Sequence, residues 1–159
     1  MMQNVINVIR DDYKFLKFVE DDLYFWSPQL QEVHYKKDPL SETDTWRLLH
    51  EIGHALLNHE RFRLDIELLQ LEIAAWEKAK EIAMQYGLTI SEDHVQDCLD
   101  TYRDWLYKRS ICPNCMCTSL QHTSKSYNCY NCNNSWMVSA SRTCRTYRKK
   151  QKAPAIEAF

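Results

Sequence analysis

Residues 46–59 read WRLLHEIGHALLNH, and this stretch decides how the rest of the chain is interpreted. It contains the pattern H-E-x-x-H, formed by His50, Glu51 and His54. Residues four apart lie nearly above one another on an α-helix, so the two imidazoles can point at one metal ion while Glu51 lies beside it. Two imidazoles bind Zn²⁺ when a third ligand completes the set, and the carboxylate can act as a general base. The motif therefore predicts two ligands and the general base of a catalytic zinc site.

The surrounding residues predict that the motif lies on a buried amphipathic helix. Leu49, Ile52, Leu56 and Leu57 form an apolar stripe at helical spacing. Gly53 interrupts the helix at a cost of roughly 1 kcal/mol relative to alanine, so we expect another backbone or a substrate to approach closely there. The competing interpretation is an ordinary core helix with two polar histidines.

The third ligand is sought first among the later histidines. In metzincins a third histidine lies six residues after the second, but that position is Glu60 in this chain. His59 is five residues after His54 and, on a continuing helix, would lie about 140° around the axis. We therefore expect His59 to be an exposed or capping residue.

A glutamate on the next helix is the better candidate. Apolar residues recur at helical spacing between residues 64 and 86, and Gly87 fits the position after a helix end. Glu72 lies near the apolar face of this segment, whereas Glu67 and Glu77 are competitors. The sequence alone leaves open whether Glu72 or Glu77 is the ligand.

Length and composition favour one globular domain with a small additional module. The 159 residues are 45% hydrophobic, and no stretch is long and apolar enough for a transmembrane helix or a signal peptide. We expect no membrane association and a cytoplasmic location. Without a signal sequence, the clustered cysteines indicate metal ligands rather than disulfides.

The charge distribution divides the chain. Residues 1–107 carry 11 Lys/Arg and 21 Asp/Glu, a net charge of −10, whereas residues 108–159 carry 9 and 1, a net charge of +8. We predict a catalytic domain over residues 1–107, a ribbon over 108–140 and a basic, flexible tail over 141–159. The basic part is expected to meet an anionic partner.

Two Cys-x-x-Cys pairs predict the ribbon. Cys112, Cys115, Cys129 and Cys132 have the spacing of a structural site in which four thiolates bind one zinc ion. Cys117 and Cys144 are left over. The chain is thus expected to bind two Zn²⁺ ions, one catalytic and one structural.

The basic residues that follow the ribbon suit phosphate contacts, with aromatic residues for base stacking. The candidate nucleic-acid ligands are Arg142, Arg145, Arg148, Lys149 and Lys150. A flexible tail that only increases solubility is an equally good interpretation.

The fold class predicted from these segments is α+β. Residues 21–37 predict a β-hairpin that either covers the core or aligns an extended substrate, and residues 39–44 provide turn and capping residues. A third helix is expected after Ser91, which is a good N-cap. The expected architecture is a small sheet with about three helices, followed by the ribbon.

The H-E-x-x-H stretch, followed by Glu72, Ala75 and Trp76, resembles the ImmA/IrrE-type zinc metallopeptidases over roughly residues 15–106. The resemblance implies a minimal zincin fold and a peptidase, and in several members the substrate is a helix-turn-helix repressor. It also implies that His50, His54 and Glu72 are ligands and that Glu51 is the general base. This chain has Ala74 where the family often has a second acidic residue.

Two other functions compete with this one. A SprT-like protease acting on DNA-bound proteins also combines H-E-x-x-H with a C-terminal zinc ribbon, but it expects a third histidine downstream. A non-catalytic module that binds nucleic acid or protein through the ribbon would have no use for Glu51.

Overall fold

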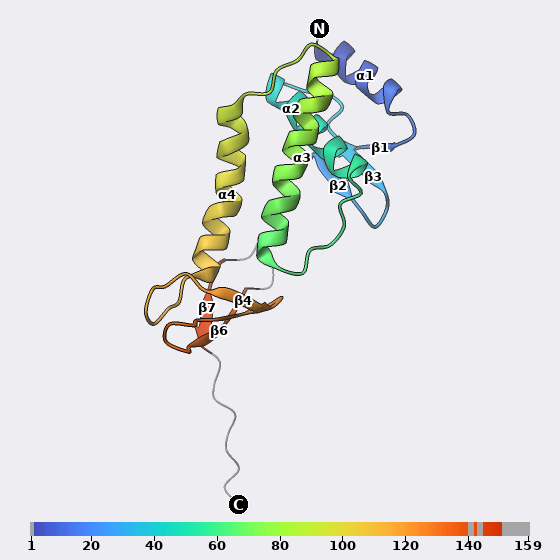
Figure 1. Cartoon of the computed structure of the whole chain (residues 1–159). Coiled ribbons are helices and arrows are strands. Elements are labelled where there is room, and N and C mark those ends of the chain that lie inside the picture. Colours follow the sequence, from blue (N-terminus) through green and yellow to red (C-terminus); the bar gives the residue numbers. More distant parts are fainter. Residues whose placement is uncertain (1, 140–141, 143–144, 151–159) are drawn as a thin grey trace, which may run out of the picture. The chain divides into compact units, whose positions relative to one another are not determined.

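The computed structural model describes residues 2–139, 142 and 145–150, and it is mixed α+β with two small sheets (Figure 1). The four helices are α1 (Met2–Asp12), α2 (Glu42–Leu56), α3 (Asp65–Gln85) and α4 (Glu92–Ser110). The first sheet contains β1 (Lys17–Glu20), β2 (Phe25–Ser27) and β3 (Glu32–Tyr35). The second contains β4 (Leu120–Thr123), β5 (Ser126–Asn128), β6 (Ser135–Val138) and β7 (Arg148–Lys150). The predicted fold class is confirmed.

The chain divides into two compact units. The first unit comprises Met1–Arg61 and Leu69–Leu99, and the second comprises Phe62–Leu68 and Asp100–Phe159. The division falls inside α4 rather than after residue 107, because the end of α4 packs with the ribbon. There the indole Nε1 of Trp136 donates to the Arg109 carbonyl at 2.9 Å.

The first sheet has the strand order β1-β3-β2, with β3 parallel to β1 and antiparallel to β2. The antiparallel pair, in which Phe25 lies opposite His34, confirms the hairpin predicted over residues 21–37. Because β3 is central, all four of its residues are buried. Its neighbour β2 is therefore an edge strand.

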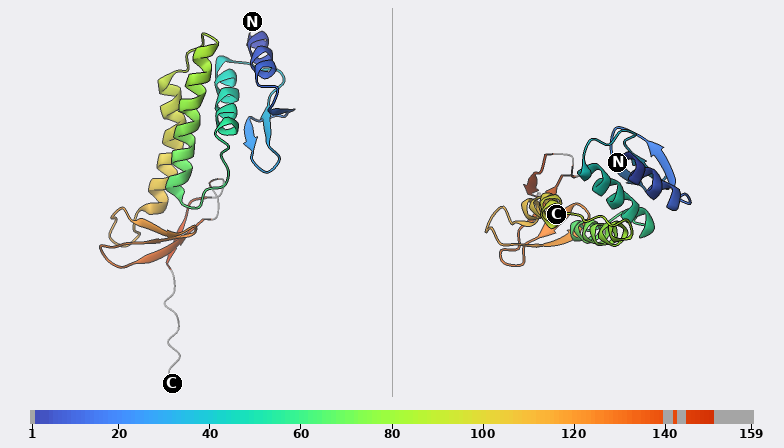
Figure 2. Two further views of the ribbon diagram at one scale, coloured as in Figure 1. Left: turned by 45° about the vertical axis from the view of Figure 1, so that its right-hand side comes forward. Right: turned by 90° about the horizontal axis from the view of Figure 1, so that it is seen from above.

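In the first unit, α2 lies between the sheet and α3, as Figure 1 and Figure 2 both show. Ser41 precedes α2, and its backbone N–H donates to the Asp44 side chain at 3.1 Å, as the predicted capping residues require. The core combines residues of α1, the sheet and all three remaining helices, including Ile6, Val33 and Ile82. This core fixes the face of α2 that carries the motif.

One helix was not predicted. In α1 the side chains of Ile6 and Ile9 are fully buried against the core, with Val5 beside them. Their spacing of three and four residues is the helical signal that the sequence offered. The first unit therefore contains one helix more than expected.

The second unit is built around a buried polar cluster and a small apolar core. Asp65, at the start of α3, accepts hydrogen bonds from Arg109 Nε and from the Tyr127 hydroxyl, both at 2.6 Å. Both Asp65 and Arg109 are buried, so each needs the other's charge. The apolar core contains Tyr127, Trp136 and Val138 together with Cys112 and Cys129.

Residues 148–150 belong to the ribbon sheet rather than to a flexible tail. They form β7, which pairs antiparallel with β6 and places Arg148 opposite Val138. The sheet order is β4-β5-β6-β7, so β7 lies at an edge. Residue 140 of the predicted ribbon and residues 141, 143–144 and 151–159 of the predicted tail lie outside the described residues.

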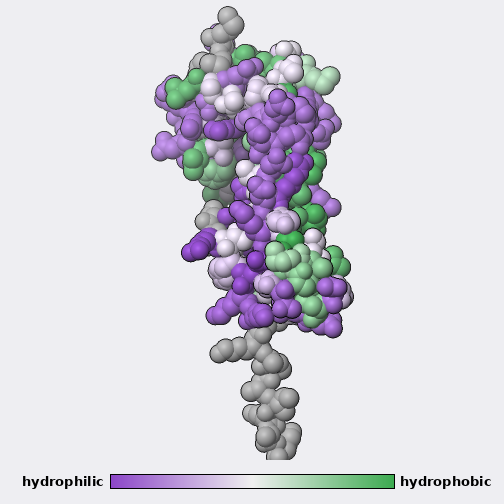
Figure 3. All heavy atoms as spheres, turned by 90° about the vertical axis from the view of Figure 1, so that its left-hand side faces the viewer, coloured by the Kyte–Doolittle hydropathy of each residue, from purple (hydrophilic) through white to green (hydrophobic). Residues whose placement is uncertain are grey.

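Among the described residues, no helix has both the length and the apolar character needed to cross a membrane. The face drawn in Figure 3 is mostly hydrophilic, with separate hydrophobic patches.

Candidate metal centres

The two histidines of the motif converge because α2 is regular across them. The Nε2 atoms of His50 and His54 lie 3.1 Å apart, and the two rings are nearly perpendicular at 87°. Both side chains are buried. On the other side, His50 stacks on Trp76 of α3, with ring centroids 4.2 Å apart. Packing therefore fixes the position of the His50 ring.

Glu72 of α3 completes the cluster. Its Oε2 lies 3.1 Å from His50 Nε2, and its Oε1 lies 3.5 Å from His54 Nε2. The two helices approach closely where α2 has Gly53, because a Cβ built there would lie only 2.6 Å from the carbonyl oxygen of Ala75. The close approach expected at Gly53 is thus made by another backbone.

The competing glutamates lie elsewhere. Glu77 is exposed and its carboxylate accepts from Lys80 at 2.8 Å. Glu67 caps the start of α3 by accepting from the backbone N–H of Arg63 and of Leu64. These hydrogen bonds lower the pKa of Glu67. Of the three candidates, only Glu72 lies with the two histidines.

His50, His54 and Glu72 form a possible metal-binding group, and its separations can be compared with those of a zinc site. Nitrogen and oxygen ligands lie about 2.0–2.1 Å from zinc, so the edges of a tetrahedron around it measure about 3.3–3.4 Å. His50 Nε2 lies 3.1 Å from His54 Nε2 and 3.1 Å from Glu72 Oε2, whereas His54 Nε2 lies 3.5 Å from the other carboxylate oxygen, Oε1. Burial alone raises the pKa of Glu72, but hydrogen bonds from His50 and His54 outweigh it and lower the pKa to about 2. A cation at the centre would replace the hydrogen bonds between Glu72 and the two imidazoles.

Glu51 lies beside this cluster and is held by the sheet. Its Oε2 accepts from the backbone N–H of Trp26, the central residue of the edge strand β2, at 2.8 Å. Burial raises the pKa of Glu51, while the neighbouring imidazoles of His50 and His54 oppose the shift. A raised pKa suits a carboxylate that takes and returns a proton near neutral pH.

His59 is half-buried rather than exposed, and it caps the end of α2, because its backbone N–H donates to the His54 carbonyl at 3.0 Å. The helix ends at Leu56, and Asn58 has a φ of 50°, so the chain turns back instead of continuing around the axis. The Nδ1 atom of His59 consequently lies 2.8 Å from Nδ1 of His54. Burial lowers the pKa of His59, which favours the neutral ring.

This contact can determine which nitrogen of His54 faces the cluster. If His54 Nδ1–H donates to a neutral His59, then the Nε2 lone pair of His54 is left for a metal ion. The carbonyl of His59 is itself fixed, because it accepts from the indole Nε1 of Trp26 at 2.8 Å. Trp26 therefore contacts both sides of the site, through Glu51 and through His59.

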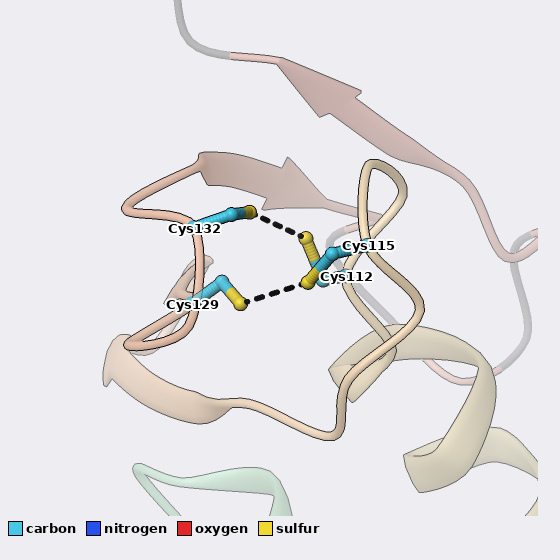
Figure 4. Close-up of side chains that lie close together, drawn as sticks. All are labelled: Cys112, Cys115, Cys129 and Cys132. Carbon is cyan, nitrogen blue, oxygen red and sulfur yellow. Dashed lines mark hydrogen bonds between the residues drawn. The ribbon is translucent and has the colours of Figure 1, made fainter.

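The four cysteines of the ribbon also converge (Figure 4). Two come from the loop after α4 and two from the turn between β5 and β6. The Sγ atoms of Cys112 and Cys132 are 3.6 Å apart, and those of Cys115 and Cys129 are 3.4 Å apart. Zinc–sulfur bonds of about 2.3 Å give tetrahedral edges of about 3.8 Å. The cluster is a plausible metal site, consistent with zinc.

The two Cys-x-x-Cys knuckles have the same backbone conformation after their second cysteine. The residue after each second cysteine has a positive φ, 63° at Met116 and 58° at Asn133. The backbone N–H of Met116 donates to the Cys112 carbonyl, and that of Asn133 donates to the Cys129 carbonyl. Each loop therefore closes tightly enough to bring two sulfurs together.

The thiols do not ionise equally. A hydrogen bond from Asn131 lowers the pKa of Cys115, and the backbone N–H of Cys132 lowers that of Cys129. A hydrogen bond from Asn114 favours ionised Cys132, but its thiol neighbours Cys112 and Cys115 help to raise its pKa to about 11. Four thiolates this close need a cation, and a bound metal ion supplies it.

The remaining cysteines differ in placement. Cys117 packs against the apolar core of the second unit but does not belong to the four-sulfur group. Cys144 lies outside the described residues.

The five basic residues predicted to contact nucleic acid differ in their surroundings. Arg142 is engaged within its unit, since its guanidinium carbon lies 3.7 Å from the Tyr102 ring centroid and Nη1 donates to Thr101. Arg145 is exposed, and Arg148, Lys149 and Lys150 form the exposed edge strand β7.

Comparisons with models of protein families, with curated proteins and with solved structures gave no match.

Proposed function

We propose that this chain is a zinc-dependent metallopeptidase of the ImmA/IrrE-like type that cleaves a protein substrate. The observation that carries the proposal is the triangle of His50, His54 and Glu72 with Glu51 directly beside it. A general base held next to a ligand set of this kind matches the chemistry of peptide hydrolysis. We assign the ligands to the three residues of the triangle and a second, structural zinc to the four cysteines.

When bound, zinc supplies a Lewis acid that lowers the pKa of water toward neutrality and polarises a carbonyl. Glu51 accepts a proton from water and passes it to the leaving amine. The Trp26 N–H holds the Glu51 carboxylate in place, and burial keeps its pKa raised.

The edge strand supports a protein substrate. Trp26, at the centre of β2, reaches Glu51 with its backbone N–H, so this strand runs past the general base. An extended peptide can pair with a sheet edge through its main chain, and because Glu51 occupies the Trp26 N–H, such pairing would use the other backbone groups of β2. An edge strand beside the base thus suits a polypeptide better than a compact small molecule.

The SprT-like alternative is less well supported. It requires a third histidine as ligand, whereas the residue beside both motif histidines is Glu72. His59 contacts the far nitrogen, Nδ1, of His54 and does not share the cluster.

The decisive experiment combines metal analysis with proteolysis. We expect two zinc ions per chain by elemental analysis, one in Glu72→Ala and two in the matched control Glu77→Ala. Cleavage of a degenerate peptide library should occur with the unaltered chain and cease in Glu51→Gln. One zinc per unaltered chain, unchanged in Glu72→Ala and accompanied by no cleavage, would instead favour a ribbon-based binding module.

A further inference from the structure

A hollow in the second unit lies beside the first Cys-x-x-Cys knuckle, and none of the four clustered cysteines lines it. Its volume is about 230 Å³, and it lies where the end of α4 and the loop after it meet the segment that leads into β7. Its walls include Tyr107, Lys108, Ile111, Met116, Tyr147 and Arg148.

The walls combine flat, polarisable groups with positive charge. The side chains of Tyr107, Met116 and Tyr147 are 60%, 64% and 53% exposed, which is unusual for three large residues around one hollow. Lys108 and Arg148 add two cations, and none of the described residues that line the hollow is acidic. Arg148 is oriented by a hydrogen bond from its Nη1 to the carbonyl of Ile111.

Among the described residues that line the hollow the charges are all positive, and the nearest acid along α4 is the exposed Asp104, one helical turn before Lys108. Residues 108–159 carry nine basic residues and one acidic residue, and the three residues of β7 are all basic and exposed. Basic residues on an edge strand also prevent pairing between sheets, and this explains Lys149 and Lys150. It does not explain two exposed tyrosines and a methionine around a hollow beside them.

We propose that this hollow binds one base of a single-stranded nucleic acid, with the adjoining phosphates on Lys108 and β7. Aromatic rings stack on bases of any sequence, and neighbouring cations bind the backbone. A single strand is required because the base must leave its stack to enter the hollow. The proposal stands independently of peptidase activity.

The geometry also revises which basic residues take part. Arg142 stacks on Tyr102, so we assign the phosphate contacts to Lys108 and to the three residues of β7 instead. Met116 follows Cys115 in the first knuckle, so the hollow keeps its wall only when that knuckle is folded.

The test uses the whole zinc-loaded chain and two fluorescein-labelled oligonucleotides, a 12-mer of thymidine and a 12-mer with abasic sites at its centre. Both carry the same phosphates, so fluorescence anisotropy separates base binding from charge. We expect the abasic strand to bind roughly fivefold to a hundredfold more weakly. Equal affinity for the two strands would overturn the base-binding hollow without depending on any variant.

Variants then locate the site. Tyr107→Ala and Tyr147→Ala should each weaken binding of the thymidine strand by about fivefold or more, whereas Tyr147→Phe should retain it. Lys125→Ala, which removes an exposed charge that does not line the hollow, should change the affinity less than Lys108→Ala. The ribbon zinc is measured in each variant to establish that it is folded.

A third arm distinguishes nucleic acid from acidic protein. An oligoglutamate peptide of matched charge should fail to displace the thymidine strand at equal concentration. Equal competition by this peptide, or the absence of oligonucleotide binding at low salt, would refute the proposal.

Discussion

His59 lies outside the H-E-x-x-H motif, but its ring contacts His54 of the motif directly. Its ring meets Nδ1 of His54 at 2.8 Å, and its carbonyl is held by the Trp26 indole. A hydrogen bond to the second nitrogen of a ligating imidazole fixes both the tautomer and the ring orientation. If His54 is a ligand as proposed, His59 acts through His54 and is a positioning residue.

We predict that His59→Ala weakens zinc binding at the first centre by roughly 10- to 100-fold, because His54 loses the partner that orients it. The measurement is zinc competition against a chromophoric chelator. His122→Ala, which removes an exposed imidazole from β4, is the matched control and should change nothing. Equal affinity in both variants would show that His59 has no positioning role.

For individual residues, the sequence predicted the contacts that depend only on local spacing. His50 and His54 are one helical turn apart, and each Cys-x-x-Cys pair spans one tight turn, so their convergence follows from short-range geometry. The contact made by His59 depends on where α2 ends, and the positive φ of Asn58 carries only a weak signal in the sequence. The sequence therefore predicted an exposed or capping residue and not the contact between the His59 and His54 rings.

Among the elements, the pair α2 and α3 determines whether Glu72 can reach the histidines. Gly53 of α2 faces the backbone of Ala75, and Trp76, the next residue of α3, stacks on His50. Both contacts lie within about one helical turn of the site. The glycine therefore permits the close approach that places Glu72 beside His50 and His54.

We predict that Gly53→Ala destabilises the first unit by about 1–3 kcal/mol, the usual cost of overpacking, despite the better helix propensity of alanine. The added Cβ would meet a backbone oxygen at 2.6 Å, and backbone cannot move as a flexible side chain can. Urea unfolding followed by tryptophan fluorescence measures the change.

Gly87→Ala is the comparison for this prediction. Gly87 has a φ of +66° and no atom within 4 Å of an added Cβ, so alanine there costs backbone strain of about 1 kcal/mol and no packing. Only Gly53→Ala should also reduce zinc occupancy of the first centre. If both variants lose stability equally and keep their zinc, then the close helix approach does not support the site.

Of the elements that were not predicted, α1 carries a local helical signal, whereas β7 depends on a distant partner. The strand β7 is three basic residues long and has no apolar alternation, so only its pairing with β6 makes it a strand. By contrast, α3 and the hairpin of β2 and β3 carry their own periodic patterns and end signals, and both were predicted. Pairing across many residues cannot be inferred from a local pattern.

For the whole molecule, the two units differ in what holds them together. The first unit buries apolar residues from the sheet and from all four helices, including Leu49, Ile52 and Ala79. The main apolar cluster of the second unit has five buried members among the described residues, and two of them, Cys112 and Cys129, are candidate zinc ligands. A core this small rarely stabilises a fold alone. Metal binding should therefore contribute most of the folding free energy of the ribbon.

We predict that chelation removes the second unit's structure before that of the first. After treatment with EDTA, hydrogen exchange of the backbone amides in β5 and β6 should accelerate to nearly the rate of an unfolded chain, because structural zinc contributes on the order of 10 kcal/mol. Amides of β3 and the middle of α2 should stay protected by the core around them.

Cys129→Ser is the control that separates the two metals, since it disables the ribbon site and leaves His50, His54 and Glu72 unchanged. It should reproduce the chelator's effect on β5 and β6. Uniform loss of protection in both units would mean that the chain folds as one cooperative body and that the ribbon zinc supports the first unit as well.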